Sequence, residues 1–538
     1  MKLVTADQMR ALEQRADKSG NTFAMMMEKA GKAVADVMTA KLVGRGTRNN
    51  RILVLVGPGN NGGDGLVCAR YLCEMGADVS IYAWKRAGGV DDLNFKRCIE
   101  HGIPITQSES DQDLSALQDL LARSDVLVDA LLGTGVARPI EGRLKDVMGV
   151  VRATAEKRVK NEWRNLIPSP VIPVRPAPLV VAVDLPSGLN PDTGAQDPAT
   201  LDADFTVTFA FPKIGQLLFP GTESVGELIV ADIDIPAAWA DDIQTEVATV
   251  DDVTARLPAR PQNSHKGTYG NAMICAGSIN YVGAAYLAGS AAARAGAGLV
   301  TLALAGAIQS MVASAAHETT FLPLPDDAGV LTPEAAGVLL RGSSDYDALL
   351  IGPGFGRNPK TIEFVQLTWR STERPKHLVI DADALYALAQ TPEWWKNLED
   401  TPAILTPHPG EMATLCGLET SAVQSDRLSI ARRFATLWHQ VIVLKGAHTV
   451  VAGPDGRAML IPFATPALAT AGTGDVLAGT ITALLAQKLD PFDAAVVGAY
   501  LHGLAGKIAE EEIGRAGAVA GDLLLRLPMA MRRLRDEA

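Results

Sequence analysis

Gly57-Pro-Gly-Asn-Asn-Gly-Gly-Asp-Gly65 directly follows the apolar run Ile52–Val56, and Ala471-Gly-Thr-Gly-Asp475 directly precedes the apolar run Val476–Leu485. Both stretches are rich in glycine, because only a chain without side chains brings several backbone N–H groups close to one phosphate. Each also opens an expected helix, whose positive N-terminal end favours an anion. Two such loops in one chain indicate two nucleotide-binding sites, and therefore two chemistries.

Apolar runs of strand length alternate with helical stretches along the whole chain, which is typical of α/β domains with mostly parallel sheets. Because 538 residues exceed what one core usually supports, we expect two domains, residues 1–240 and 245–538, joined near residues 240–262. The expected strands are Ile52–Val56, Val79–Ala83, Val126–Ala130, Leu179–Asp184, Phe205–Phe209, Leu228–Val230, Ala272–Ala276, Leu299–Leu304, Ala348–Ile351, Leu378–Ile380, Ala403–Leu405, Val441–Leu444 and Ala458–Ile461.

Two local patterns add detail to the first half. Thr5-x-x-Gln8 is a capping box that predicts a helix with Met9, Leu12 and Ala16 on one face. The segment Arg152–Pro178 is basic and then proline-rich, so we expect an extended surface insertion there. The alternative reading of that segment is a basic patch that guides a phosphorylated ligand.

Composition narrows the class of ligand. A net charge of −12 argues against a nucleic-acid-binding surface, because phosphate backbones are bound by basic surfaces. Five cysteines without metal-ligand spacing are typical of a reducing compartment, so we expect a cytoplasmic protein. No uninterrupted apolar stretch reaches the roughly 20 residues of a membrane span. We therefore expect small-molecule ligands, with neither nucleic acid nor membrane as a partner.

The first glycine loop has the dinucleotide spacing Gly57-x-Gly59-x-x-Gly62 between a strand and a helix expected to begin near Asp64. Such sites usually place an acidic residue at the end of the second strand to hold the ribose. Here Val79–Ala83 is followed by Trp84-Lys85-Arg86. This argues against ordinary NAD binding for hydride transfer, and the basic residues would tolerate a ribose 2′-phosphate.

Polar residues stand at two further strand ends, Asp129 at one and Asp184 with Ser187 at the other. Because the carboxyl ends of parallel strands meet at one edge of a sheet, we expect these residues and Asn61 to form one site. Asp alone could instead cap the following turn. Asn, Asp and Ser oxygens are hard ligands that suit an alkali or alkaline-earth cation rather than zinc.

Residues 1–235 resemble the NAD(P)H-hydrate epimerases, the YjeF amino-terminal family, through Asn60-Asn-Gly-Gly-Asp-Gly65, Asp129-Ala-Leu-Leu-Gly-Thr-Gly135 and Asp184-Leu-Pro-Ser-Gly188. The resemblance implies a Rossmann-like domain that interconverts the R and S epimers of hydrated NADH and NADPH. It also implies a potassium ion held by Asn61, Asp129 and Ser187. The residues implied to line the hydrate site are Asn60, Asn61, Gly62, Gly63, Asp64, Gly133, Thr134, Gly135, Val136, Ala137, Arg138, Pro139 and Asp184. Inversion needs proton transfer on opposite faces or ring opening, with Asp184 as the candidate base and Lys213, alternatively a surface charge, as its partner.

The second glycine loop, Gly472-Thr-Gly-Asp475, can stabilise the charge of a transferring phosphoryl group and place Asp475 as the base that accepts a hydroxyl proton. The alternative role for Asp475 is an ordinary helix cap. Four other expected strands also end in glycine, charge or histidine, so we expect one shared crevice. Their ends are Gly352-Pro-Gly-Phe-Gly356, Asp381-Ala-Asp383, Thr406-Pro-His-Pro-Gly-Glu411 and Lys445-Gly-Ala-His-Thr449.

With Ser264-His-Lys-Gly, these motifs resemble the carbohydrate-kinase-like dehydratases of hydrated NAD(P)H, the YjeF carboxy-terminal family, over residues 245–530. The resemblance implies a ribokinase-like domain, so that both domains are three-layer αβα sandwiches. It implies that ADP activates the S epimer for dehydration, giving AMP and phosphate, with Mg²⁺ accompanying the nucleotide. By position, the adenine nucleotide would contact Lys445, Gly446, Ala447, His448, Thr449 and Gly474. The hydrate would contact Ala284, Gly354, His408 and the base Asp475. His448 stands where the family commonly has a small residue.

Together these features predict a bifunctional repair enzyme for the hydrates of NADH and NADPH (NADHX and NADPHX), with K⁺, Mg²⁺ and ADP as its ions and co-substrate. We expect it to form a homo-oligomer. One alternative is a vitamin or sugar kinase fused to a nucleotide-binding module, which would transfer phosphate and stop. Another is an amino-terminal domain that binds a nucleotide without turning it over.

Overall fold

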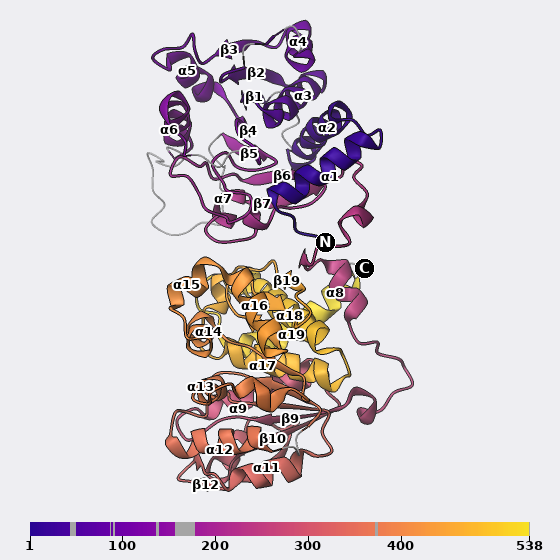
Figure 1. Ribbon diagram of the computed structural model, residues 1–538, viewed down its shortest axis with the longest axis vertical. Helices are drawn as coiled ribbons and strands as arrows, with labels where there is room; N and C mark the ends of the chain where they lie inside the picture. The colour runs from indigo at the N-terminus through magenta and orange to yellow at the C-terminus, as the bar shows by residue number, and fades with distance from the viewer. Residues whose placement is uncertain are drawn as a thin grey trace. The chain divides into compact units, whose positions relative to one another are not determined.

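The computed structural model describes residues 1–42, 50–86, 88–89, 92–135, 139–156, 178–371 and 375–536. The chain divides into two compact units, Lys2–Ile243 and Gln244–Ala538, the second of which also includes Met1 (Figure 1). None of the described helices combines the length and apolar character that a membrane span requires. Each unit is a mixed α/β structure built on its own sheet, as expected from the sequence.

The amino-terminal unit is built on a parallel sheet with the strand order β3-β2-β1-β4-β5-β6-β7. The order changes direction between β1 and β4, and open α/β sheets bind ligands beyond the strand ends at this switch point. The strands are β1 (Arg51–Val56), β2 (Asp78–Ala83), β3 (Ile105–Gln107), β4 (Val126–Ala130), β5 (Leu179–Val183), β6 (Phe205–Phe209) and β7 (Glu227–Ala231). The helices are α1 (Ala6–Lys18), α2 (Phe23–Lys41), α3 (Asn60–Glu74), α4 (Leu93–Glu100), α5 (Ser115–Arg123), α6 (Gly142–Glu156) and α7 (Thr222–Val225).

Both faces of this sheet are covered by helices, which makes the unit three-layered (Figure 1). Successive side chains of β1 alternate between two cores. Ile52 and Val54 pack with α1, α2 and α3, whereas Leu53 and Leu55 pack with α5 and α6. Burying a branched aliphatic side chain contributes about 1.5–3 kcal/mol, so both helical layers are held by apolar packing.

The carboxy-terminal unit has a larger sheet with the order β11-β10-β9-β14-β15-β16-β17-β18-β19-β8, parallel from β11 to β17. A short hairpin, β12 (Asp326–Asp327) with β13 (Val330–Leu331), lies apart from it. The sheet strands are β8 (Thr245–Val247), β9 (Asn271–Cys275), β10 (Leu299–Ala305), β11 (Thr320–Leu324), β14 (Ala348–Ile351), β15 (His377–Ile380), β16 (Ala403–Leu405), β17 (Val441–Leu444), β18 (Val450–Ala452) and β19 (Ala458–Leu460).

Helices surround this sheet, and α17 packs against β9, β14, β15 and α9. α17 is buried along almost its whole length, which explains the apolar run that follows the second glycine loop. The helices are α8 (Val250–Arg256), α9 (Val282–Arg294), α10 (Gln309–Ala313), α11 (Ala335–Ser343), α12 (Pro359–Arg370), α13 (Asp383–Ala389), α14 (Pro409–Cys416), α15 (Thr420–Ser425), α16 (Arg427–Trp438), α17 (Thr473–Ala486), α18 (Pro491–Glu512) and α19 (Ala520–Asp536).

Every strand expected from the sequence is present, with ends that differ by one residue at most. The capping box is also confirmed, since Thr5 caps α1 together with Gln8. The predicted start of α3 was wrong, since this helix begins at Asn60 and not near Asp64. Its first residues include glycines that are required for close packing, and because glycine is a poor helix former the sequence did not indicate a helix there. Residues 152–156 of the expected insertion are the last turn of α6, and residues 157–177 lie outside the described residues.

Candidate active sites

The first glycine loop is pressed against the segment that follows β4. The Gly57 backbone N–H donates to the Ala130 carbonyl oxygen at 3.1 Å. A Cβ at Gly57 would lie 1.8 Å from the Leu131 carbonyl oxygen, and one at Gly62 would lie 2.0 Å from the Gly57 carbonyl oxygen. These two positions therefore accept only glycine without movement of the backbone. The loop is thereby fixed at the switch point of the sheet.

Asn61, Asp129 and Ser187 come together beneath this loop, as the sequence predicted. The Ser187 hydroxyl donates to Asp129 Oδ1 at 2.6 Å, and the Ser187 backbone N–H donates to Asp129 Oδ2 at 2.8 Å. Asn61 Nδ2 donates to the Leu132 carbonyl oxygen at 2.8 Å, while Asn61 Oδ1 is buried and has no hydrogen-bond partner among the described residues. An unpartnered buried oxygen beside a buried carboxylate fits a hard cation.

Asp129 is only 1% exposed, and no described cationic side chain pairs with it. Burial raises the pKa of Asp129 above its usual value, and the hydrogen bonds from Ser187 and Leu131 oppose that rise. A bound cation would compensate for the charge of this carboxylate, because a buried charge is costly unless it is paired.

Asp184 and Lys213 form a buried ion pair at the ends of β5 and β6. Lys213 Nζ donates to Asp184 Oδ1 at 2.5 Å and to Thr208 Oγ1 at 2.9 Å, and Thr208 Oγ1 donates to Asp184 Oδ1 at 2.9 Å. Gln216 Nε2 donates to the Asp184 backbone oxygen at 2.7 Å. Asp184 has a φ of 61°, a backbone strain that is common at functional sites. Since Lys213 is 1% exposed, its reading as a surface charge was wrong.

Two more carboxyl groups act electrostatically on this pair. Burial raises the pKa of Asp64 well above its usual value, and the negative charges of Asp184 and Glu13 raise it further. Burial also raises the pKa of Glu13. The positive charge of Lys213 opposes this rise, and the negative charge of Asp184 adds to it. The backbone of Val4, just before α1, hydrogen-bonds on both sides of Lys213 and so places α1 beside the site. Glu13 carries no motif of its own in the sequence, so only the fold reveals its position.

The other residues expected around the hydrate differ in position. Gly133 lies against Asn61, since a Cβ on Gly133 would be 3.0 Å from the Asn61 Cβ. Thr134 and Gly135 form the turn after β4, and Pro139 is exposed before α6. Asn60, Gly62 and Gly63 lie in the first turn of α3, and Asp64 directly follows this turn. Val136, Ala137 and Arg138 lie outside the described residues.

In the carboxy-terminal unit, the ends of β14, β15, β16 and β17 are neighbours, as expected for one crevice. Lys445 Nζ donates to Asp381 Oδ1 at 2.7 Å and lies 3.7 Å from Glu411 Oε2. The Thr406 hydroxyl also donates to Asp381 Oδ1 at 2.7 Å. The motifs after β15, β16 and β17 therefore meet at the Lys445 ammonium group. Asp381 and Glu411 had no assigned role in the sequence, although their motifs pointed to this edge of the sheet.

Asp475 lies in the first turn of α17, whose N-cap is Gly472. Asp475 is therefore not the N-cap, and its alternative interpretation as an ordinary helix cap was wrong. Burial raises the pKa of Asp475 to about 7, with a further rise from the charge of Asp381 and an opposing effect of Lys445. A base is most effective when its pKa lies near the working pH. Gly474 adjoins the same ammonium group, since a Cβ there would be 3.6 Å from Lys445 Nζ.

Ala284, Gly354 and His408 occupy two other parts of this edge. Gly354 has a φ of +67° and packs so closely on α9 that a Cβ would be 2.6 Å from the Ala284 Cβ. His408 is the N-cap of α14, and its Nδ1 accepts hydrogen bonds from the backbone N–H groups of Gly410 at 3.0 Å and Glu411 at 3.2 Å. His408 thus has a capping role, while more than half of its side chain remains exposed.

The segment Lys445–Thr449 is held by a partly buried arginine, Arg427. Arg427 donates to the carbonyl oxygens of Leu444 at 3.0 Å, Lys445 at 3.2 Å and Ala447 at 2.6 Å. Burial lowers the pKa of Arg427 to about 10. Within the segment, Gly446 and His448 both have positive φ, and the Thr449 hydroxyl donates to the Gly446 carbonyl oxygen. Arg427 belongs to no motif, so the sequence did not identify this brace.

Comparison with known proteins covers both units. The family described as "YjeF-related protein N-terminus" matches residues 23–215, and the family described as "NAD(P)H-hydrate dehydratase" matches residues 272–528. A bifunctional NAD(P)H-hydrate repair enzyme of Thermofilum pendens is 37% identical over 542 residues, covering 100% of this chain and 97% of its own length. The corresponding enzyme of Moorella thermoacetica is 38% identical over 544 residues, covering 100% and 98%. The crystal structure of ADP/ATP-dependent NAD(P)H-hydrate dehydratase from Bacillus subtilis, with ATP/Mg²⁺, is 32% identical, covers 54% of this chain and 98% of its own, and has a TM-score of 0.46.

Proposed function

This chain belongs to the family of bifunctional NAD(P)H-hydrate repair enzymes, and on that premise we propose how its two units divide the work. The amino-terminal unit interconverts the R and S epimers of hydrated NADH and NADPH. The carboxy-terminal unit dehydrates the S epimer at the expense of ADP, giving AMP and phosphate. The observation that carries this proposal is the end-to-end match to repair enzymes, which span the whole of this chain. A vitamin or sugar kinase with an accessory module would not account for a match across both units.

In the amino-terminal unit, Asp184 is the base and Lys213 is the cation that positions it. The ion pair at 2.5 Å supports this assignment, because it fixes the carboxylate at the ends of β5 and β6. Asp64 is the acid, because burial and the charges of Asp184 and Glu13 raise its pKa and so favour its protonated form. Inversion at one carbon requires a base and an acid, and these two residues come from the segments after β5 and β1.

Asn61, Asp129 and Ser187 are the residues that would hold a potassium ion. The unpartnered Asn61 Oδ1 and the buried, uncompensated Asp129 carboxylate support this assignment. When bound, the ion supplies a fixed positive charge next to the crevice. The three residues also connect the first turn of α3 with the segments after β4 and β5, so they position the walls of the site.

In the carboxy-terminal unit, Asp475 removes the proton of the hydrate hydroxyl. The oxygen then attacks the terminal phosphorus of ADP, and AMP leaves as the bond between the two phosphates breaks. The nitrogen lone pair of the ring expels phosphate, and loss of a proton from the neighbouring carbon restores the dihydropyridine. Backbone N–H groups at the start of α17 and the Lys445 ammonium stabilise the transferred charge. The raised pKa of Asp475, about 7, supports its role as the base.

The nucleotide is expected to lie along Lys445–Thr449, with Mg²⁺ bound to its phosphates. Mg²⁺ usually retains several waters and takes only one or two carboxylates, so it needs no dedicated protein cage. The preference for ADP over ATP is part of this proposal. The five free cysteines support a cytoplasmic location, and a homo-oligomer remains our expectation, which light scattering would test.

The decisive experiment uses a mixture of R and S hydrates of NADH with ADP, followed by the absorbance of the dihydronicotinamide. The full-length protein should restore all of it. Asp184→Asn should promptly restore only the S fraction, and Asp475→Asn should restore none. Phosphorylated product without regained absorbance would instead identify a kinase. If Asp184→Asn converted the R epimer as fast as the wild type, Asp184 would not be catalytic, and the amino-terminal unit would be interpreted as a binding module.

A further inference from the structure

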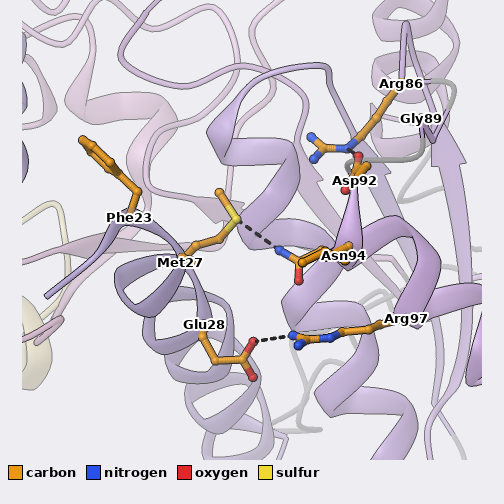
Figure 2. A pocket seen from close by; sticks show the side chains of 10 residues that line it. Phe23, Met27, Glu28, Arg86, Gly89, Asp92, Asn94 and Arg97 are labelled. Carbon is orange, nitrogen blue, oxygen red and sulfur yellow. Dashed lines mark hydrogen bonds and ion pairs between the residues drawn. The ribbon is translucent and has the colours of Figure 1, made fainter. Parts of the chain in front are cut away.

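A cavity of about 640 Å³ lies in the amino-terminal unit, outside the group of residues assigned to the reaction (Figure 2). Its walls come from the first turns of α2, the segment after β2 and helix α4. Pockets for small molecules typically measure about 300–1,000 Å³, so this one is large enough for a nucleoside phosphate.

The cavity shares a wall with the first glycine loop. Arg86 Nη1 donates to the carbonyl oxygens of Gly57 at 3.0 Å and Gly59 at 2.9 Å. The Met27 sulfur packs on α3, where a Cβ on Gly63 would lie 2.6 Å from it. A ligand that leaves the loop towards the end of β2 would therefore enter the cavity directly.

The strand order determines which half of a dinucleotide would point this way. The Asp184–Lys213 pair lies at the ends of β5 and β6, on one side of the switch point between β1 and β4. The β2 end lies on the other side. If the reacting nicotinamide half is bound near Asp184, the adenosine half extends across the glycine loop towards β2, as in dinucleotide-binding sheets of this order.

The lining of the cavity suits a phosphorylated adenosine. Phe23 and Leu93 are 42% and 61% exposed, so apolar surface is available to a purine ring. Among the described residues, Asn94 Nδ2 donates only to the Met27 sulfur, at 3.2 Å, and a thioether is a weak acceptor that a ligand oxygen would replace. Figure 2 shows the Asn94 amide in contact with the Met27 sulfur at the wall of the cavity.

Arg97 is the cation available to a phosphate group. Its Nη1 lies 3.6 Å from Glu28 Oε2, beyond ordinary hydrogen-bond distance, and half of its side chain is exposed. Glu28 Oε1 already accepts hydrogen bonds from Arg70 and from Tyr71, the latter at 2.8 Å. Arg86, by contrast, is occupied by the glycine loop and by Asp92 at 2.8 Å. Arginine binds phosphate oxygens bidentately, which a loosely paired guanidinium permits.

We infer that this cavity binds the adenosine end of the hydrated coenzyme and that Arg97 binds the 2′-phosphate that distinguishes NADPH from NADH. The inference rests on the proposed epimerase function of this unit. It makes Arg97 a residue that sets coenzyme preference, whereas Phe23 serves the adenine that both coenzymes share.

The test measures epimerisation by the full-length protein without ADP, so that the dehydratase stays idle. Arg97→Gln should raise the KM for hydrated NADPH about tenfold, the loss expected for one charge-assisted contact, and change that for hydrated NADH less than about twofold. Phe23→Ala should raise both KM values together. The matched control is Arg123→Gln, an exposed arginine on α5 outside the cavity, which should change neither.

A binding probe complements the kinetics. Adenosine 2′,5′-bisphosphate should inhibit wild-type epimerisation competitively, 5′-AMP should inhibit more weakly, and Arg97→Gln should abolish the difference between them. Unchanged KM values in Arg97→Gln, or equal losses for both hydrates, would overturn the inference. A wild-type protein that does not epimerise either hydrate would instead overturn the proposed function, so the two failures are distinguishable.

Discussion

Single carboxyl groups with raised pKa values stand at the centre of both proposed sites, and their chemistry depends on burial. Asp475 lies in the first turn of α17 and Asp64 lies just after the first turn of α3, and both helices begin at a glycine loop. Burial makes the charged form costly, so each group holds its proton to a higher pH than an exposed aspartate. The same residue type therefore becomes a base near neutrality in one unit and a proton donor in the other.

Asp475→Asn should lower the rate of ADP-dependent dehydration by about 10²–10⁴-fold and leave epimerisation intact. In the wild type, this rate should rise with pH through about 7 and then level off, because the ionised form of Asp475 is the active one. The measurements are pH–rate profiles of absorbance recovery with the S epimer. A wild-type rate that is flat across neutral pH would contradict the assignment.

Asp475 also has a predictable effect on stability. Its pKa is raised from 3.8 to about 7 in the folded state, so the folded chain binds this proton more tightly than the unfolded chain between those values. The contribution of Asp475 to stability is therefore present at low pH and lost as pH rises through that window. Asp475→Asn should have a Tm at pH 8 no lower than the wild type, which separates a catalytic role from a structural one.

Asp64→Asn should slow epimerisation by about 100-fold or more, because the asparagine amide cannot supply the proton. The wild-type rate should fall as the pH rises through the raised pKa of Asp64, and dehydration of the S epimer should be unchanged in the variant. Glu13→Gln is the matched control, since it alters a neighbouring carboxyl group without removing the proposed acid. Equal losses in both variants would mean that the overall charge of the cluster, rather than Asp64, matters.

At the scale of elements, the first glycine loop and the segment Lys445–Thr449 both follow strand ends, and each is fixed in a different way. The contact between Gly62 and Gly57 fixes the first turn of α3, which carries Asn61 and directly precedes Asp64. The segment Lys445–Thr449 is instead held from outside, by Arg427 at the start of α16. The first glycine loop thus depends on the absence of side chains, and the segment Lys445–Thr449 depends on the partly buried side chain of Arg427.

Gly62→Ala should destabilise the amino-terminal unit by about 1–3 kcal/mol or more and abolish epimerisation, because the new methyl group overlaps the Gly57 carbonyl oxygen. Gly59→Ala is the matched control within the same loop. A Cβ on Gly59 meets nothing within 4 Å, and its φ of −85° suits any residue. Thermal unfolding and epimerisation rates should separate the two variants, and similar behaviour of both would refute the packing argument.

Arg427→Met should raise the KM for ADP about tenfold, because three backbone carbonyl groups lose a charged donor and the segment Lys445–Thr449 loosens. Epimerisation should not change. Arg433→Met, which alters an exposed position on the same helix, should leave the KM for ADP at the wild-type value. An unchanged KM in Arg427→Met would show that the segment does not need its brace.

At the scale of the whole molecule, each unit has its own sheet, its own core and its own proposed site. The division falls between Ile243 and Gln244, just before β8. β8 pairs with β19 and therefore belongs to the carboxy-terminal sheet. Separate cores are consistent with two activities that can be separated.

A fragment of residues 244–538 should dehydrate the S epimer with ADP, and a fragment of residues 1–243 should equilibrate the epimers. A mixture of the two should restore all the absorbance of mixed hydrates. A fragment that begins at residue 250 should have a lower Tm than one that begins at residue 244, because it leaves the edge of β19 unpaired. Inactive but folded fragments would show that each site needs the other unit.

The sequence by itself determined most of the strands, the layered α/β class, the two glycine loops and the approach of Asn61, Asp129 and Ser187 at one edge of the sheet. Apolar runs and glycine spacing are local patterns, so they can be recognised from neighbouring residues alone. The ends of parallel strands must in addition meet at one edge of the sheet. The edge strands β3, β8 and β11 were not expected, since none of them is a continuous run of buried apolar residues.

Only the tertiary structure decided that Lys213 is buried against Asp184, that Glu13 of α1 adjoins them, that Arg427 braces Lys445–Thr449, and that a cavity lies beside Arg97. Each of these depends on residues brought together from distant segments. Their burial, and hence their pKa values and available partners, exists only once the helices cover the sheet. The identity of a residue does not indicate whether the folded chain buries it. The chemistry of these groups could therefore not be derived from the sequence.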